Sequence, residues 1–126
     1  MDDLILPATQ YTPEIHFEYS RHRLLIGGES YPENTSEFYT PVFKSLKVYL
    51  DDLDGEEVTV ILRMRYFNSS SSKILMNFFD LLEMAGRNNN TITVNWYYRQ
   101  NDTDAMEFGQ EFSVDLNAIR FNIIAE

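Results

Sequence analysis

The segment from Glu57 to Arg99 constrains the fold more than any other, because it contains two strand patterns with a helix pattern between them. Apolar residues alternate with mixed ones over residues 57–67 and 91–99, whereas they recur at helical spacing from Ile74 to Ala85. Two strands joined by one helix predict a right-handed parallel crossover. The segment therefore indicates an α/β fold.

The flanking sequence adds elements of the same kinds. Alternation over Ile15–Ser20, a short polar turn and a second strand over Arg23–Ile26 predict an antiparallel hairpin, which Gly27-Gly28 should end. The first thirteen residues are expected to be extended. An amphipathic helix is predicted up to Asp54-Gly55, a shorter helix after residues 102–104, and a last strand over Ile119–Ile124. The order is β-β-α-β-α-β-α-β.

The start of the first helix has several possible signals. Candidate caps are Asn34, Thr35, Ser36 and Thr40, and Pro41 suits a first helical turn. In the strand that follows, Val58, Val60, Leu62, Met64 and Tyr66 are expected on the apolar face, with Phe67 on the mixed one.

One face of the predicted sheet is largely polar. The outward positions are His16, Glu18, Thr59, Arg63, Arg65, Thr93, Asn95, Tyr97, Arg99, Arg120 and Asn122. A parallel sheet covered on both faces would carry nearly continuous apolar strands, so we expect a mixed sheet with helices packed mainly on one face. The four arginines are either scattered charges on a solvated surface or a patch for a partner or a second copy.

Composition narrows the class of function. The chain has 126 residues, 44% of them hydrophobic, which is enough for a single domain over residues 1–126. Its net charge of -10, from 10 basic and 20 acidic residues, argues against binding nucleic acid or anionic membranes. There are no cysteines, which excludes disulfides and thiol catalysis. The absence of a signal peptide or an apolar span predicts a cytoplasmic protein.

Motifs of catalysis are missing from the sequence. His16 and His22 are the only histidines, and neither stands in a metal-binding spacing. No glycine-rich phosphate loop or nucleophile motif occurs. We therefore expect no metal, no cofactor and no enzymatic activity.

The most informative segment joins a strand to a helix, from Tyr66 to Lys73 through four consecutive serines. A helix start offers unpaired backbone N–H groups and partial positive charge, so a phosphorylated hydroxyl there would find donors. Lys73 lies one turn after Ser69 and could pair with such a phosphate. The alternative interpretation is that Asn68 or Ser69 only caps the helix.

Three motifs together resemble the SiaC family of bacterial regulatory phosphoproteins, whose fold is similar to the STAS domain of anti-sigma factor antagonists. They are Glu29–Asn34 followed by Phe38-Tyr39, the run Tyr66–Ser71, and Val94–Tyr98. The resemblance extends over nearly the whole chain in order. It implies a STAS-like mixed sheet.

The resemblance also implies a phosphorylation switch in cyclic di-GMP signalling. The unphosphorylated protein would bind and stimulate a SiaD-type diguanylate cyclase, a SiaB-type kinase would phosphorylate it, and a SiaA-type PP2C-like phosphatase would reverse this. The family's phosphoacceptor follows an Asn at the strand-to-helix junction, which corresponds here to Ser69, with Ser70 as second choice. Asn68, Ser70 and Lys73 are candidates for phosphate or partner contacts.

Two alternatives remain at this stage. One is a partner switch like the anti-sigma factor antagonists, which carry an Asp-Ser-Ser-Gly motif at the junction. Asn68 and Ser71 depart from its first and last residues, which favours the SiaC branch. The other is a small-molecule-binding or catalytic domain that uses the open, arginine-bearing sheet face.

Overall fold

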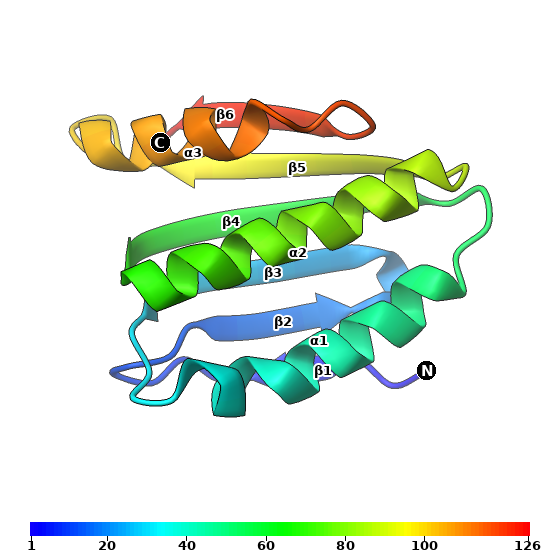
Figure 1. The fold of residues 1–126 in the computed structure, drawn as a ribbon, viewed down its shortest axis with the longest axis horizontal. Helices are drawn as coiled ribbons and strands as arrows, with labels where there is room; N and C mark the ends of the chain where they lie inside the picture. The colour runs from blue at the N-terminus through cyan, green and yellow to red at the C-terminus, as the bar shows by residue number, and fades with distance from the viewer.

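The strands lie in the sheet in their order along the chain (Figure 1). The computed structural model describes residues 1–126. Its strands are β1 (Leu4–Leu6), β2 (Glu14–Glu18), β3 (Arg23–Ser30), β4 (Glu57–Phe67), β5 (Thr91–Tyr98) and β6 (Arg120–Ala125). The β1–β2 and β2–β3 pairs are antiparallel, and every later pair is parallel. The predicted hairpin and mixed sheet are thus confirmed.

Each α-helix connects two neighbouring parallel strands. The helices are α1 (Thr35–Asp51), α2 (Ser69–Arg87) and α3 (Thr103–Ser113), and a 3-10 turn, η1 (Tyr19–Arg21), closes the hairpin. All three α-helices lie on the same face of the sheet, and each crossover is right-handed (Figure 1). The prediction of helices on one face is confirmed. None of the helices is both long enough and apolar enough to span a membrane.

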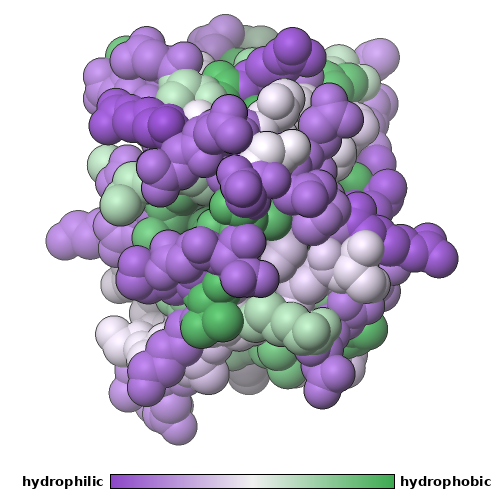
Figure 2. Space-filling view, turned by 90° about the vertical axis from the view of Figure 1, so that its right-hand side faces the viewer, coloured by the Kyte–Doolittle hydropathy of each residue, from purple (hydrophilic) through white to green (hydrophobic).

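The molecule has two distinct ends because the parallel strands all point the same way. We call the end where β3, β4 and β5 finish and the α-helices begin the carboxyl edge (Figure 1). Figure 2 shows the opposite end, where α1 and α2 finish, and hydrophilic side chains cover most of it. In open α/β sheets, ligands gather at the carboxyl ends of the strands.

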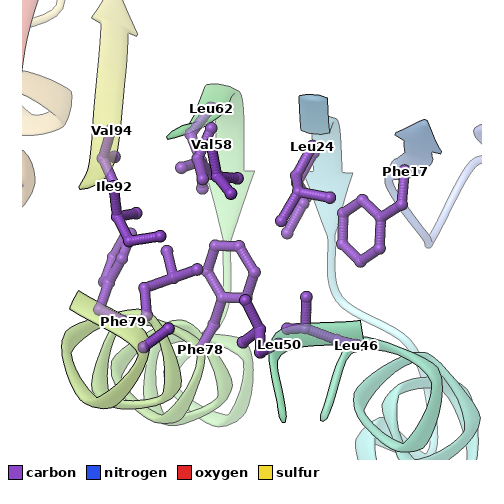
Figure 3. Close-up of a cluster of buried hydrophobic side chains, with 14 of the residues drawn as sticks. Phe17, Leu24, Leu46, Leu50, Val58, Leu62, Phe78, Phe79, Ile92 and Val94 are labelled. Carbon is purple, nitrogen blue, oxygen red and sulfur yellow. The ribbon is translucent and has the colours of Figure 1, made fainter. Parts of the chain in front are cut away.

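The hydrophobic core fills the layer between the sheet and the helices (Figure 3). Phe78 and Phe79 of α2 and Leu46 and Leu50 of α1 point towards the strands (Figure 3). The facing side chains are Phe17, Leu24, Val58, Leu62, Ile92 and Val94. This packing holds α2 against the sheet.

At the end of the sheet opposite the carboxyl edge, buried polar side chains make hydrogen bonds to the backbone of the loops. The carboxylate of Glu83, in α2, accepts hydrogen bonds from the backbone N–H groups of Asn117 (2.8 Å) and Ala118 (2.7 Å). Asn90 accepts from the N–H of Glu56 at 3.0 Å and donates to the carbonyl of Ala85 at 3.1 Å. These side chains tie the end of α2 to the loops that enter β4 and β6.

The structure adds a strand to the extended first residues, extends β3 beyond its predicted end, and selects Asn34 among the candidate caps of α1. A strand, β1, forms within the extended first residues because Leu4–Leu6 pair with β2. Gly27-Gly28 does not end β3, which continues to Ser30 through parallel pairing with β4. Asn34 caps α1 by accepting from the N–H of Glu37, so the helix starts at Thr35 and Pro41 lies inside it.

The predicted apolar face of β4 is correct up to Met64 and wrong for its last two residues. Gly28 pairs with Met64 but Glu29 pairs with Tyr66, so Arg65 is an extra residue in a bulge. The extra residue reverses the alternation. Tyr66 is therefore 53% exposed, while Phe67 turns inward against Trp96 and the aromatic rings of α3.

Candidate functional site

The predicted strand-to-helix junction lies at the carboxyl edge and is built around Asn68. Its side-chain oxygen accepts from the N–H of Ser71 at 2.9 Å, and its own N–H donates to the carbonyl of Ser30 at 3.1 Å. Asn68 is therefore the cap of α2, with Ser69 as the first helical residue. This settles the choice between the two candidate caps and leaves the Ser69 hydroxyl free of that role.

The four serines that follow have different environments. Ser69 and Ser70 are exposed, Ser72 is half-buried, and Ser71 is 0% exposed. No side-chain hydrogen bond involves the hydroxyl of Ser69 or Ser70, whereas that of Ser71 contacts Ser30 at 2.8 Å. The hydroxyls of Ser69 and Ser70 are therefore accessible from solvent without any opening of the helix.

A chain of three buried hydroxyl groups lies directly beneath the serines. The Tyr39 hydroxyl contacts Ser30 Oγ at 2.6 Å, and Ser30 Oγ contacts Ser71 Oγ at 2.8 Å. Burial raises the pKa of Tyr39, partly opposed by its hydrogen bond to Ser30, so its hydroxyl stays neutral at physiological pH. The chain connects α1, β3 and α2 just below Ser69.

Sequence reasoning missed this hydroxyl chain. Tyr39 belongs to the quoted family motif, but its hydrogen-bond partner Ser30 lies 9 residues away in the sequence. Ser71, the second partner of Ser30, lies 41 residues from Ser30. The sequence does contain one indication of the chain, which is a tyrosine at a core-facing position of the predicted helix. A buried tyrosine hydroxyl usually needs a hydrogen-bond partner.

The charges around the junction distinguish Ser69 from Ser70. The first turn of α2 contains no acidic residue, and Lys73 follows one turn later. The N–H groups of Ser69 and Ser70 have no intrahelical acceptor. Ser70, however, lines a broad, shallow concavity of about 1090 Å³ together with Glu33 and Glu37 of the α1 start. A phosphate on Ser70 would face those carboxylates, which favours Ser69.

Three tyrosines form an exposed aromatic cluster beside the junction. Tyr31 contacts Tyr11 and Tyr66 edge to face, with ring centroids 5.4 and 5.6 Å apart. Tyr11 and Tyr66 are each more than half exposed. Alternation along β4 predicts an inward Tyr66, but the bulge turns this side chain outward and so completes the cluster.

The four open-face arginines do not form one patch. A small hollow at the carboxyl edge is lined by Arg63, Arg65 and Arg99. Arg120 lies far from it, at the first residue of β6, where it is opposite Thr93 of β5 in the sheet. Within the hollow, Arg63 donates to Glu126 Oε1 at 2.9 Å and lies over the Tyr97 ring at 4.3 Å. Asp102 and Glu126 also line the hollow and offset its charge. The predicted patch of four arginines is thus corrected to three, and the two carboxylates partly neutralise their charge.

Each of the two histidines is partly exposed and contacts neighbouring side chains. His16 lies between the carboxylates of Glu14 and Glu18, and His22 contacts the Tyr49 hydroxyl at 2.6 Å and Glu56 at 3.3 Å. No group of three or more histidine, aspartate or glutamate side chains is arranged to hold a metal ion.

Comparison with known proteins places this chain in a family. The model of SiaC family regulatory phosphoproteins matches residues 6–126. The chain belongs to the SiaC family. An uncharacterized protein of Pseudomonas aeruginosa strain UCBPP-PA14 is 35% identical to it over 116 residues, which are 91% of this chain and 90% of that protein.

Solved SiaC structures from Pseudomonas aeruginosa share the whole fold. SiaC matches with a TM-score of 0.90 and 34% identity over 100% of both chains. A second structure, of the diguanylate cyclase SiaD in complex with its activator SiaC, matches with a TM-score of 0.92 and 34% identity, covering 98% of this chain and 100% of that one. The mixed sheet with its three helices is therefore the fold of the SiaC family.

Proposed function

We propose that this SiaC family protein is a phosphorylation-switched activator of a diguanylate cyclase, with Ser69 as its regulatory phosphoacceptor. The observation that carries the proposal is the free, exposed hydroxyl of Ser69 directly after the capping Asn68. The similarity to SiaC, which is the activator of SiaD in its complex, supports the choice of partner. The protein itself catalyses nothing and acts in the cytoplasm, where the cyclase finds GTP.

Two further enzymes would set the state of Ser69. A SiaB-type kinase transfers the γ-phosphoryl group of ATP to the Ser69 oxygen; ADP leaves, and the hydroxyl proton passes to a base of the kinase. A SiaA-type PP2C-like phosphatase hydrolyses the ester with water and restores the hydroxyl. The exposure of Ser69 suits both reactions, because neither enzyme has to unwind α2.

Phosphorylation should block association without unfolding the protein. Within this chain, the N–H groups of Ser69 and Ser70 and the ammonium of Lys73 can accommodate the phosphate. At a partner interface, the added charge of about -1.5 to -2 would have to lose its water. An unpaired buried charge costs several kcal/mol, so the unphosphorylated form is the one that binds.

Site-directed phosphorylation tests the assignment. The cognate kinase and ATP should add one phosphate to the wild type, and peptide mass spectrometry should locate it on Ser69. Ser69→Ala should accept none, whereas the matched control Ser70→Ala should be labelled normally. Labelling of Ser69→Ala on Ser70 or a later residue would refute the choice of Ser69.

A further inference from the structure

The two edge strands of the sheet differ in how well they are protected against pairing with another chain. β1 pairs over only three residues, and two aspartates precede it and Pro7 follows it. β6 has six residues, pairs only with β5, and is the last strand of the sheet (Figure 1). From Phe121 to Ala125 it contains no proline and no charged residue, and its register with β5 is unbroken. Such features are what usually protects an edge, so the β6 edge is open to pairing.

The free side of β6 carries regularly spaced backbone groups. The N–H of Glu126 donates to the carbonyl of Tyr98 at 2.8 Å, so this residue directs its backbone groups towards β5. Successive residues of a strand direct these groups to opposite sides, and Phe121, Ile123 and Ala125 therefore direct theirs away from β5. No hydrogen bond within the chain uses those outward groups.

Apolar surface is also left uncovered along this edge. Phe121 and Ile123 pack against the core on the helix side of the sheet, but both are only half-buried. Their neighbours in β5, Val94 and Trp96, are 0% and 1% exposed. A strand added beyond β6 would cover the remaining surface of Phe121 and Ile123, because paired residues share a face of the sheet.

We propose that a second copy of this chain occupies the edge, through antiparallel pairing of β6 with β6 that joins two sheets into one. The inference goes beyond the proposed function and does not depend on the cyclase. A two-fold axis at Ile123 places this residue opposite Ile123 of the second copy, and Phe121 opposite Ala125 of the second copy. Since all three residues direct their backbone groups outward, this register gives every free N–H and C=O group among them a partner.

The charges at the ends of β6 favour a second copy and select the register. Arg120 belongs to no ion pair within the chain. Glu126 accepts from Arg63 through one carboxylate oxygen, which leaves the other oxygen available. In the proposed register, Arg120 of each copy lies opposite Glu126 of the other, on the open face of the sheet. Opposite charges in directly facing positions stabilise a strand pair, and moving the register in either direction loses both pairs.

The β6 edge is separate from the proposed phosphoacceptor. β4, which leads into the junction, lies two strands in from β6. Pairing of two copies therefore leaves Ser69 exposed, and phosphorylation should not change the self-association.

Sedimentation velocity over a range of concentrations tests for the dimer. An interface made by one strand pair is small, so we expect a dissociation constant in the micromolar range. Ala125→Pro removes an outward N–H that the fold does not use, and it should weaken self-association roughly tenfold or more. The matched control Ala125→Ser keeps that N–H and should stay within about twofold of the wild type.

A charge swap tests the register. Arg120→Glu brings two carboxylates together and Glu126→Arg brings two guanidinium groups together, and symmetry repeats each change. Each variant alone should therefore self-associate roughly tenfold more weakly than the wild type. When the two variants are mixed, opposite charges face each other at both positions, so a heterodimer should form with an affinity within about threefold of the wild type. The control Arg65→Glu makes the same change at an exposed position of β4 and should dimerise normally.

Circular dichroism on every variant checks that the fold is intact before the outcomes are compared. A wild type that stays monomeric at every concentration overturns the inference and leaves the proposed function untouched. A dimer that Ala125→Pro does not weaken has its interface elsewhere, which also overturns it. If the Arg120→Glu and Glu126→Arg variants stay monomeric when mixed, the antiparallel register is wrong.

Discussion

The two ends of the sheet differ in whether the polar groups next to α2 have hydrogen-bond partners. At the end opposite the carboxyl edge, buried Glu83 and Asn90 satisfy the backbone groups of the incoming loops. The approach is so close that a methyl group added to Gly86 would lie 2.4 Å from the Ala118 carbonyl oxygen. At the carboxyl edge, by contrast, the hydroxyl and N–H groups of Ser69 remain free.

The difference separates stability from switching. The closed end holds the C-terminal half of α2, while the first turn of α2 carries the proposed phosphoacceptor, Ser69, on a framework that is already fixed. A phosphate can then be added at one end without disturbing the packing that maintains the fold. Changes to buried polar groups, at the closed end above all, should therefore affect the free energy of unfolding, and changes to the exposed hydroxyls of the carboxyl edge should affect binding.

The largest expected effect on stability comes from Glu83→Ala. The carboxylate is 5% exposed and accepts two backbone hydrogen bonds, so its loss leaves buried donors unsatisfied. We expect urea denaturation to show a loss of about 3 kcal/mol. The control Glu107→Ala, at an exposed position of α3, should stay within about 0.5 kcal/mol. A loss as small as the control's would contradict the structural role of Glu83.

A smaller effect is expected from Tyr39→Phe. It removes one end of the buried hydroxyl chain while Ser30 and Ser71 keep their contact. Stability should fall by about 1 kcal/mol, and the amides of Ser71 and Ser72 should exchange hydrogen faster. Tyr66→Phe, which alters an exposed tyrosine, should change neither. Equal exchange in both variants would show that the hydroxyl chain does not hold the first turn of α2.

The smallest effect is expected from the open sheet face. Arg65 and Arg99 are exposed and lie on the side of the molecule that the helices do not cover. The double variant Arg65→Glu/Arg99→Glu should fold normally and change cyclase binding by less than about twofold. A loss of roughly tenfold or more would make these arginines a partner surface instead of solvated charges.

Local patterns predicted the junction well. The strand bounds Glu57–Phe67, the start of α2 after Asn68 and the right-handed crossover all depend on neighbouring residues and backbone chirality, which a sequence displays directly. The errors have non-local causes. The Arg65 bulge results from pairing with β3, and the partner of Arg63 is 63 residues away at Glu126.

The burial of Ser71 shows why the site could be named only in part from its sequence. Four consecutive serines look equivalent, and their helical phase decides which of them faces Ser30 and Tyr39. That phase is set by where Asn68 caps the helix. The family motif pointed to Ser69, and the structure adds that Ser71 is sealed and that Ser70 adjoins Glu33 and Glu37.

The central claim is that phosphate on Ser69 prevents association by its charge while the fold persists. The most direct measurement titrates the cyclase with the same protein, unphosphorylated and fully phosphorylated, and records binding, cyclase rate and melting temperature. We expect the phosphate to weaken binding more than about a hundredfold, which corresponds to about 3 kcal/mol, with little change in melting. Ser69→Ala should bind and stimulate like the wild type, and Ser69→Asp should weaken binding less than phosphate does. A phosphorylated protein that binds as tightly as the unphosphorylated one, or that fails only because it has unfolded, would contradict the claim.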